Sequence, residues 1–185
     1  MPHTTHDRRR ITDWLESRGA MDIPHPGGTL FDHLNRVADR MHRLGLAPHV
    51  QAAGRTHAAY GTDGFDVTLL DLGQRATLRD LVGVQAEELV YLYGSCDRSR
   101  TWTALPHART VWDRFTGGVQ APSTAVLRAL VDLTILNELD VVEHSPAVAA
   151  AHGAGLRQLF GSWLPLCSPE VGSLVTGWIG NAVES

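Results

Sequence analysis

Apolar residues recur at helical spacing along most of the chain. The clearest case is residues 30 to 44, where apolar positions alternate in steps of four and three while charged side chains occupy the opposite face. Thr29 precedes this pattern as a candidate N-cap, and Gly45 follows it as a stop signal. Residues 124 to 143 are apolar almost all round, which predicts a helix in the middle of the fold.

Similar patterns predict further helices on both sides of these two. They are expected near residues 11 to 18, 48 to 59, 75 to 82, 84 to 96, 147 to 160 and 169 to 182. Proline and glycine predict a loop at residues 24 to 28, residues 61 to 73 form a connector, and residues 99 to 121 predict a short irregular or hairpin insertion. The expected fold is mainly α, with one domain over residues 1 to 185 and residues 1 to 7 frayed.

The composition narrows the class of protein. A chain of 185 residues, 43% of them hydrophobic, can bury the core of one ordinary domain. Cys96 and Cys167 have no partner at metal-ligand spacing, so we expect reduced thiols in a cytoplasmic protein. The sequence contains no run of about 18 apolar residues, so it predicts no membrane span. Arginine supplies all 16 basic residues, which is typical of a GC-rich bacterium, and the net charge of -4 disfavours a nucleic-acid partner.

His57 is the first candidate for chemistry. It shares one helical face with Val50, so its imidazole is expected to point toward the core. Tyr60 follows it, together with a break at Gly61 and Thr62. Because a buried imidazole needs a partner for each ring nitrogen, His57 can be a catalytic base, a ligand, or a core histidine satisfied by its neighbours.

Two further histidines can join His57. His33 lies beside the apolar stripe of residues 30 to 44, on the border of the buried face. The short connection to the next helix favours antiparallel packing, which would let His33 and His57 converge on one inter-helix cavity. His25 can hang over the mouth of that cavity or remain an exposed loop residue.

Carboxylates among apolar neighbours mark the long helix of residues 124 to 143. Asp132, Glu138 and Asp140 would each be costly there when ionised, unless a cation or a hydrogen-bond donor is close. A metal ion or a substrate is one possible partner. The structural alternative is one of three arginines, Arg55, Arg79 or Arg98.

These segments resemble known families. His33, His57 and a late acidic residue such as Asp132 resemble the helical core of the HD-domain superfamily, known for metal-dependent phosphohydrolases and some diiron oxygenases. A closer resemblance, over about residues 25 to 140, is to an uncharacterised family of small HD-like proteins, and it implies an HD-domain-like helical bundle. That resemblance rests on Gly28-Thr29-Leu30, Asp32-His33-Leu34, His57-x-x-Tyr60-Gly61-Thr62, Arg75, Gly83-x-x-Ala86-Glu87 and Asp97-Arg98.

The chain departs from the HD pattern at two places. Ala58 stands where the metal-binding members place an aspartate after the second histidine, and the loss of that ligand disfavours dinuclear oxygenase chemistry. Gly61 and Thr62 stand where the nucleotide pyrophosphohydrolases of the superfamily carry an acidic pair.

Three classes of function remain open. The first is a cofactor-free small-molecule enzyme of specialised metabolism that performs non-redox hydrolysis, elimination or cyclisation. In it His57 is the general acid or base, Tyr60 the hydrogen-bond donor or proton relay, and His33 the neighbouring catalytic residue. Its small polar substrate is expected to contact His25, Thr62, Arg79, Asp97 and Arg98. The Asp97-Arg98 pair is equally typical of a helix cap.

The second class is a mononuclear hydrolase with a single divalent metal held by His33, His57 and Asp132. The third is a non-catalytic ligand-binding protein or homodimer. Its contact surface would include the apolar cluster between Leu156 and Leu166, although such a cluster is more typical of a core.

Overall fold

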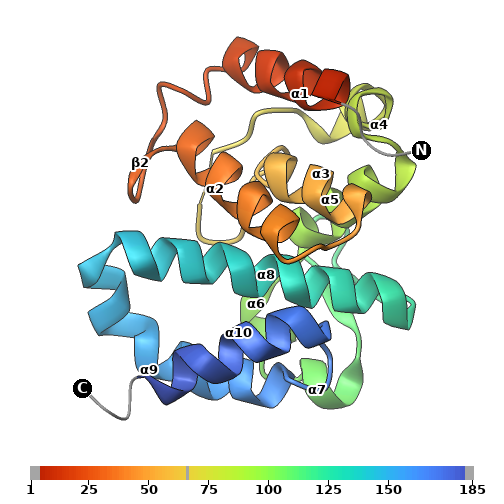
Figure 1. The fold of residues 1–185 in the computed structure, drawn as a ribbon. Coiled ribbons are helices and arrows are strands. Elements are labelled where there is room, and N and C mark those ends of the chain that lie inside the picture. The colour runs from red at the N-terminus through yellow and green to blue at the C-terminus, as the bar shows by residue number, and fades with distance from the viewer. Residues whose placement is uncertain (1–4, 66, 182–185) are drawn as a thin grey trace. The chain divides into compact units, whose positions relative to one another are not determined.

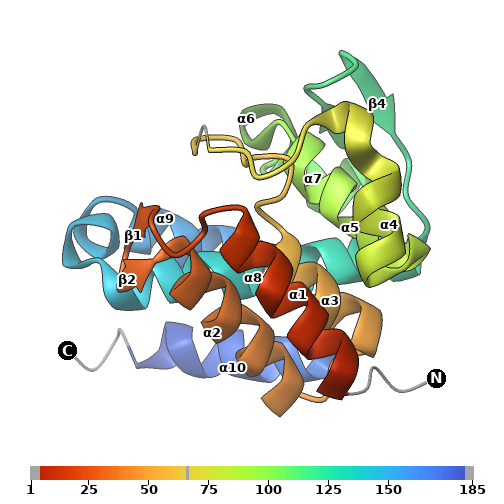
Figure 2. The ribbon, with the colours of Figure 1, turned by 90° about the horizontal axis from the view of Figure 1, so that it is seen from above.

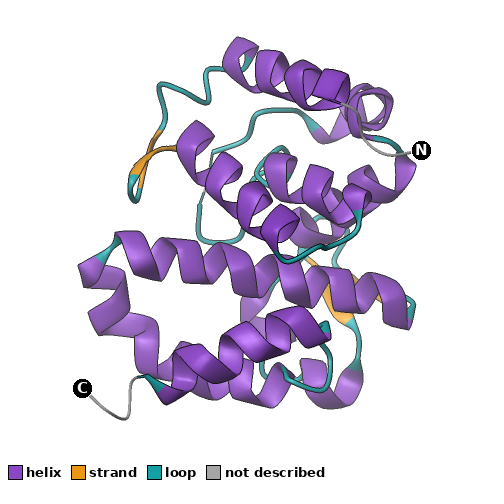
Figure 3. Ribbon diagram, viewed as in Figure 1, coloured by secondary structure: helices purple, strands orange, loops and turns teal. Residues whose placement is uncertain are grey.

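The chain forms two compact units, residues 1–96 and residues 97–185, in a computed structural model that describes residues 5–65 and 67–181. Helices make up most of each unit, and each unit also contains one short hairpin (Figure 3). The predicted mainly α class is therefore confirmed. That the whole chain acts as one domain stays a prediction.

The first unit is built from helices that pack through leucine and valine side chains. The helices are α1 (Thr5–Ser17), α2 (Leu30–Arg43), α3 (Pro48–Thr56), α4 (Arg75–Val82) and α5 (Val84–Ser95), with a 3-10 turn η1 (Leu72–Gln74) before α4. α2 packs on α3, α3 packs on α5, and α4 packs on α5 (Figures 1 and 2). Leu34, Val37 and Val90 are fully buried between them.

The start of α2 is fixed by a reciprocal cap. The Thr29 hydroxyl accepts a hydrogen bond from the Asp32 amide at 3.2 Å, and the Asp32 carboxylate accepts one from the Thr29 amide at 2.9 Å. The bond from the Thr29 amide is the main reason that the pKa of Asp32 lies below its ordinary value. The predicted N-cap is confirmed, and such a cap contributes about 1 kcal/mol.

The segment predicted as a loop at residues 24 to 28 contains a small hairpin instead. β1 (Pro24–His25) pairs antiparallel with β2 (Gly28–Thr29), with Pro24 opposite Thr29 and His25 opposite Gly28. Pro26 and Gly27 form the turn, and Gly27 has a φ of 80° that glycine adopts without strain. Strands of two residues are too short to produce the alternation that reveals a strand in a sequence.

Two helix ends also differ from the prediction. α1 begins at Thr5, so residues 5 to 7 are helical rather than frayed, while residues 1 to 4 lie outside the described residues. The apolar pattern starts only at Ile11, the first buried apolar residue of the helix, so it gave no signal for the polar turn before it. α3 ends at Thr56 and not near Ala59, because the Ala59 amide bonds three residues back to the Thr56 carbonyl at 2.9 Å and the chain continues as a turn. The Ala59 carbonyl then accepts hydrogen bonds from the Leu69 and Leu70 amides at 3.0 and 2.9 Å.

The second unit contains one long central helix and shorter elements around it. These are α6 (Arg98–Thr101), α7 (Leu105–Ala108), β3 (Val111–Asp113), β4 (Gly118–Gln120), α8 (Thr124–His144), α9 (Pro146–Trp163) and α10 (Pro169–Gly180). β3 and β4 pair antiparallel with Trp112 opposite Val119, which confirms a hairpin inside the predicted insertion. α8 is buried on nearly all sides between Leu127 and Asp140, as predicted.

The apolar cluster near the C-terminus belongs mostly to the core of the second unit. Leu156, Phe160, Trp163 and Leu166 are buried, whereas Leu164 is exposed. Helices of the described ranges are all too short or too polar to cross a membrane.

Candidate functional site

His33 and His57 meet inside the first unit. His33 projects from the buried face of α2, and His57 is the residue that caps the C-terminal end of α3. Their Nε2 atoms are 3.3 Å apart, and both side chains are buried. The structure therefore confirms that these histidines converge, and it places His33 inside the core rather than on its border.

The hydrogen bonds of His57 define the tautomer of its neutral ring. Its Nδ1 atom lies 2.8 Å from the Gly54 carbonyl oxygen, which can only accept, so Nδ1 carries a hydrogen. In the neutral ring Nε2 is then an acceptor, and it faces His33. We conclude that in the neutral pair His33 donates from Nε2 to His57.

Gly54 allows the two helices to come this close. A Cβ atom at this position would lie 2.4 Å from Sδ of Met41 on α2, closer than real Cβ contacts. The same residue supplies the carbonyl that anchors His57. Sequence reasoning missed Gly54, because a single glycine within a helix gives no signal of which helix it approaches.

The ring of His25 stacks on the ring of His33. The two ring centroids are 4.0 Å apart with an interplanar angle of 27°. The edges of Phe65 against His25 and of Tyr93 against His57 extend the aromatic group, at 5.4 and 5.1 Å between centroids. The interpretation of His25 as an exposed loop residue is therefore not borne out, because its ring packs on His33 and is only partly exposed.

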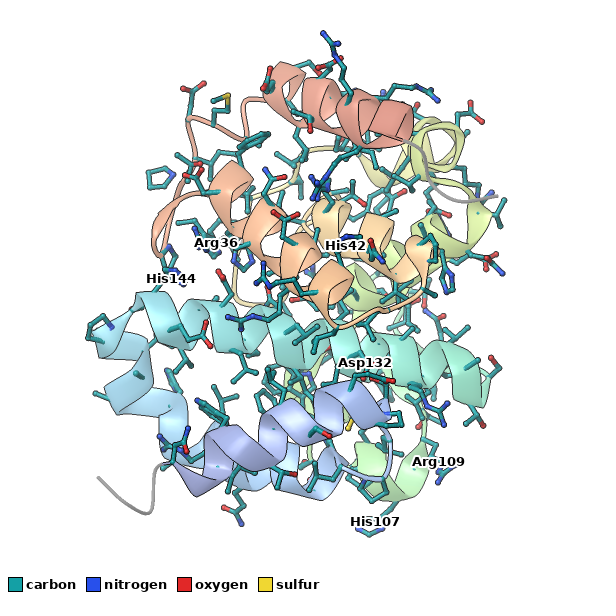
Figure 4. All side chains as sticks on the ribbon, viewed as in Figure 1. Arg36, His42, His107, Arg109, Asp132 and His144 are labelled. Atoms are coloured by element: carbon teal, nitrogen blue, oxygen red, sulfur yellow. The ribbon has the colours of Figure 1, made fainter. Side chains whose placement is uncertain are left out.

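Arg36 positions the hairpin that carries His25. Arg36 lies on α2 (Figure 4). Its guanidinium donates to the carbonyl oxygens of Pro26 at 2.9 Å and Gly27 at 3.1 Å. These bonds tie the turn between β1 and β2 to the same helix that carries His33. Arg36 is a second positioning residue that the sequence did not single out.

Tyr60 lies elsewhere than expected. Its hydroxyl donates to Oε1 of Glu87 at 2.9 Å. Burial, together with the hydrogen bond to Glu87 and its negative charge, raises the pKa of Tyr60. The hydroxyl proton is therefore bound to a carboxylate on α5 and is not poised to move to His57.

Glu87 is the centre of a charged cluster. The carboxylate is fully buried and accepts hydrogen bonds from Arg75 and Arg79 of α4 as well as from Tyr60. Burial by itself would raise the pKa of Glu87, but the hydrogen bonds from Arg75 and Tyr60 outweigh it, and the pKa is lowered. In the sequence, the signal is an acidic residue on the apolar face of α5.

The other predicted substrate contacts have structural partners of their own. Thr62 forms an isolated antiparallel bridge with Phe65. Asp97 caps α6 by accepting from the Arg100 amide at 3.0 Å, which is the capping alternative for this pair. Arg98 forms an ion pair with Glu138 at 3.0 Å.

Of the three arginines expected as partners for the carboxylates of α8, Arg98 pairs with Glu138, whereas Asp132 takes a different partner. Asp132 projects from α8 of the second unit (Figure 4). Its carboxylate accepts a hydrogen bond from the Ser168 amide at 2.9 Å. Burial raises the pKa of Asp132 to about 6. The expected partner Arg55 instead pairs with Asp39 in the first unit, at 3.1 Å.

The described residues hold no group of three or more His, Cys, Asp or Glu side chains arranged to bind a metal ion. The predicted ligand set of His33, His57 and Asp132 is thus not assembled there. The two imidazoles alone could contribute to holding a cation.

The site is of a recognisable kind, a buried imidazole pair held between two packed helices. Residues 14–98, just under half of the chain, match a family described as "Domain of unknown function (DUF6817)". The matched segment contains both the histidine pair and the Glu87 cluster. No curated protein and no solved structure matches the chain.

Proposed function

We propose that this chain is a small-molecule enzyme in which His33 and His57 perform acid–base chemistry, in a non-redox hydrolysis, elimination or cyclisation. The observation that carries the proposal is the 3.3 Å separation of the two Nε2 atoms, with Nδ1 of His57 fixed on the Gly54 carbonyl. The anchoring directs the Nε2 lone pair of His57 at His33, so His33 exchanges the proton with the substrate and His57 accepts the hydrogen bond from His33.

A buried imidazole pair suits proton transfer for a physical reason. Imidazole is the side chain whose ordinary titration lies nearest neutral pH, so gain and loss of a proton both cost little. When the pair gains a proton, the positive charge stays hydrogen-bonded to a neutral imidazole instead of being buried alone. Positioned groups of this type accelerate reactions by about 10²–10⁴-fold.

The surrounding rings favour a small substrate. His25 stacks on His33, Phe65 packs against His25, and Tyr93 packs against His57, so aromatic rings line the surroundings of the pair. His25 is partly exposed, whereas His33 and His57 are buried, so we place substrate entry on the His25 side. Tyr60 has no part in this proposal, because its hydroxyl is bound to Glu87.

The test is a turnover assay of the purified chain against panels of small polar metabolites, with product masses measured. On any substrate found, His57→Gln and His33→Gln should each lower kcat by about 10²–10⁴-fold. The matched control is His152→Gln, at an exposed position of α9, which should leave kcat unchanged. Unchanged kcat in folded His57→Gln would contradict the proposal.

Nitrogen NMR of the two imidazoles gives a readout that needs no substrate. His57 should show the tautomer with hydrogen on Nδ1, because that nitrogen donates to the Gly54 carbonyl. Neutral His33 should carry its hydrogen on Nε2, because that nitrogen donates to Nε2 of His57. The opposite assignment for His57 would remove the geometric basis of the proposal.

A metal-dependent hydrolase is the second candidate. Two nitrogen ligands at about 2.0–2.1 Å from a tetrahedral ion are about 3.3–3.4 Å apart, which agrees with the observed 3.3 Å. Metal analysis of protein prepared without a histidine tag separates the candidates. One equivalent of zinc, iron or manganese that His33→Gln abolishes would favour the metal, and substoichiometric metal would favour the cofactor-free pair.

A further inference from the structure

Two arginines one helical turn apart on α4 grip the same buried carboxylate. Arg75 donates from Nε to Oε1 of Glu87 at 2.6 Å and from Nη2 to Oε2 at 3.0 Å, and Arg79 donates from Nε to Oε2 at 2.9 Å. The Glu87 side chain is 0% exposed, whereas those of Arg75 and Arg79 are 29% and 41% exposed. The carboxylate thus lies beneath two guanidinium groups that reach the solvent.

The charges of this cluster do not cancel. Two arginines contribute two positive charges, and Glu87 contributes one negative charge because its pKa is lowered. Each of its oxygens already accepts two hydrogen bonds, from Tyr60 and Arg75 on Oε1 and from Arg75 and Arg79 on Oε2. The cluster of Arg75, Arg79 and Glu87 therefore has a net charge of +1, which favours an anionic ligand.

Hydrogen-bond donors are also left over. Within the described residues, Arg79 contacts Glu87 through Nε, and its Nη1 and Nη2 atoms have no protein acceptor. Arg75 is held in place by two bonds to Glu87 and by the ring of Tyr91, 3.8 Å from its guanidinium carbon. Guanidinium groups fixed in this way lose little further freedom when they bind an anion.

We infer that Arg75 and Arg79 form a binding site for a tetrahedral oxyanion, and that the phosphate group of a small metabolite is the ligand class it takes. Guanidinium binds phosphate oxygens through paired N–H bonds, and a phosphate has enough oxygens to engage both arginines. A carboxylate ligand would have only two oxygens to share between the N–H groups that Glu87 leaves unused, one fewer than a phosphate monoester offers. The inference uses neither His33 nor His57, so it stands or falls separately from the proposed function.

Calorimetric titration of the full chain at low ionic strength tests the site, with inorganic phosphate, glycerol phosphate and acetate as probes. We expect saturable binding of inorganic phosphate, tighter binding of glycerol phosphate, and at least tenfold weaker binding of acetate. Arg79→Gln should weaken phosphate binding at least tenfold, and Arg79→Lys, which keeps the charge but not the paired N–H bonds, should weaken it less.

The matched control is Arg43→Gln, which makes the same change of charge at an exposed position of α2 and should leave the affinity unchanged. Cooperative unfolding in urea verifies that each variant is folded. The inference is overturned if wild type binds neither phosphate compound saturably, if acetate binds as tightly, or if Arg43→Gln weakens binding as much as Arg79→Gln.

Discussion

His57 contacts His33 across the interface between two helices. Tyr60, three residues after His57 in the chain, bonds to a different residue, Glu87. The inward face of each helix was readable in the sequence, so the meeting of His33 and His57 could be predicted. Tyr60 was expected to act with His57 because the two are neighbours in the chain, yet its hydroxyl bonds to Glu87, 27 positions further on. Partners at such separations depend on which helices pack together.

At Asp132 the structure predicts a pH-dependent stability. Its pKa in the folded protein is about 6, above the ordinary value of 3.8, so the folded state holds the proton more tightly than the unfolded state does. The contribution to stability is therefore present at low pH and is lost as the pH rises from about 4 to about 6. Above pH 6 the ionised carboxylate costs roughly 2–3 kcal/mol.

Asp132→Asn should remove this cost, because its Oδ1 can still accept from the Ser168 amide. We expect the variant to exceed wild type in free energy of unfolding by roughly 2–3 kcal/mol at pH 8 and to match it below pH 4. Urea denaturation across this pH range measures both. Asp71→Asn, at an exposed position, is the control and should show no such divergence; a pH-independent difference for Asp132→Asn would contradict the assignment.

At the level of elements, periodicity located helices well and turns poorly. α2, α4, α5 and α8 begin and end within a residue or so of the predicted limits, because apolar spacing and glycine stops mark them. The hairpin of β1 and β2 and the early end of α3 were missed. Both depend on hydrogen bonds to segments distant in the chain or on a turn too short to leave a pattern.

The close approach of α2 and α3 predicts opposite effects for two glycine substitutions. Gly54→Ala places a methyl group against the buried Met41, and we expect it to lower the free energy of unfolding by about 1–2 kcal/mol despite the better helix propensity of alanine. Gly155→Ala, within α9 and with no atom within 4 Å of the added group, should raise it by about 0.5–1 kcal/mol.

Urea denaturation of both variants measures the contrast. Met41→Ala in the Gly54→Ala background should recover part of the loss relative to additive effects, since it removes the atom that the new methyl group meets. Strict additivity of the two changes would show that the contact does not control the packing of α2 on α3.

At the scale of the whole molecule, the family match and the histidine pair both fall on the first compact unit. The segment 14–98 extends only two residues past the boundary at residue 96. A unit of 96 residues can bury enough apolar surface to be stable alone. This raises the question of whether the unit is an independent domain.

We expect a fragment of residues 1–96 to fold by itself and to unfold cooperatively in urea, with helical circular dichroism. A fragment of residues 1–83, which lacks α5 and with it Glu87, should fail to do so, because Arg75, Arg79 and Tyr60 lose their common partner. If residues 1–96 show no cooperative transition, the two units fold as one domain, as the sequence suggested.

The sequence by itself determined the helical class, most helix limits, the cap at Thr29 and the inward direction of His57, while it placed His33 only at the border of the buried face. These follow from interactions between residues a few positions apart, which spacing encodes directly. Only the tertiary structure decided that Tyr60 bonds to Glu87, that Arg75 and Arg79 share that carboxylate, and that Gly54 packs against Met41 of α2. These contacts join helices that are brought together by burial of apolar surface. The apolar pattern of the sequence shows which faces are buried, but not which polar side chains meet once the helices are packed.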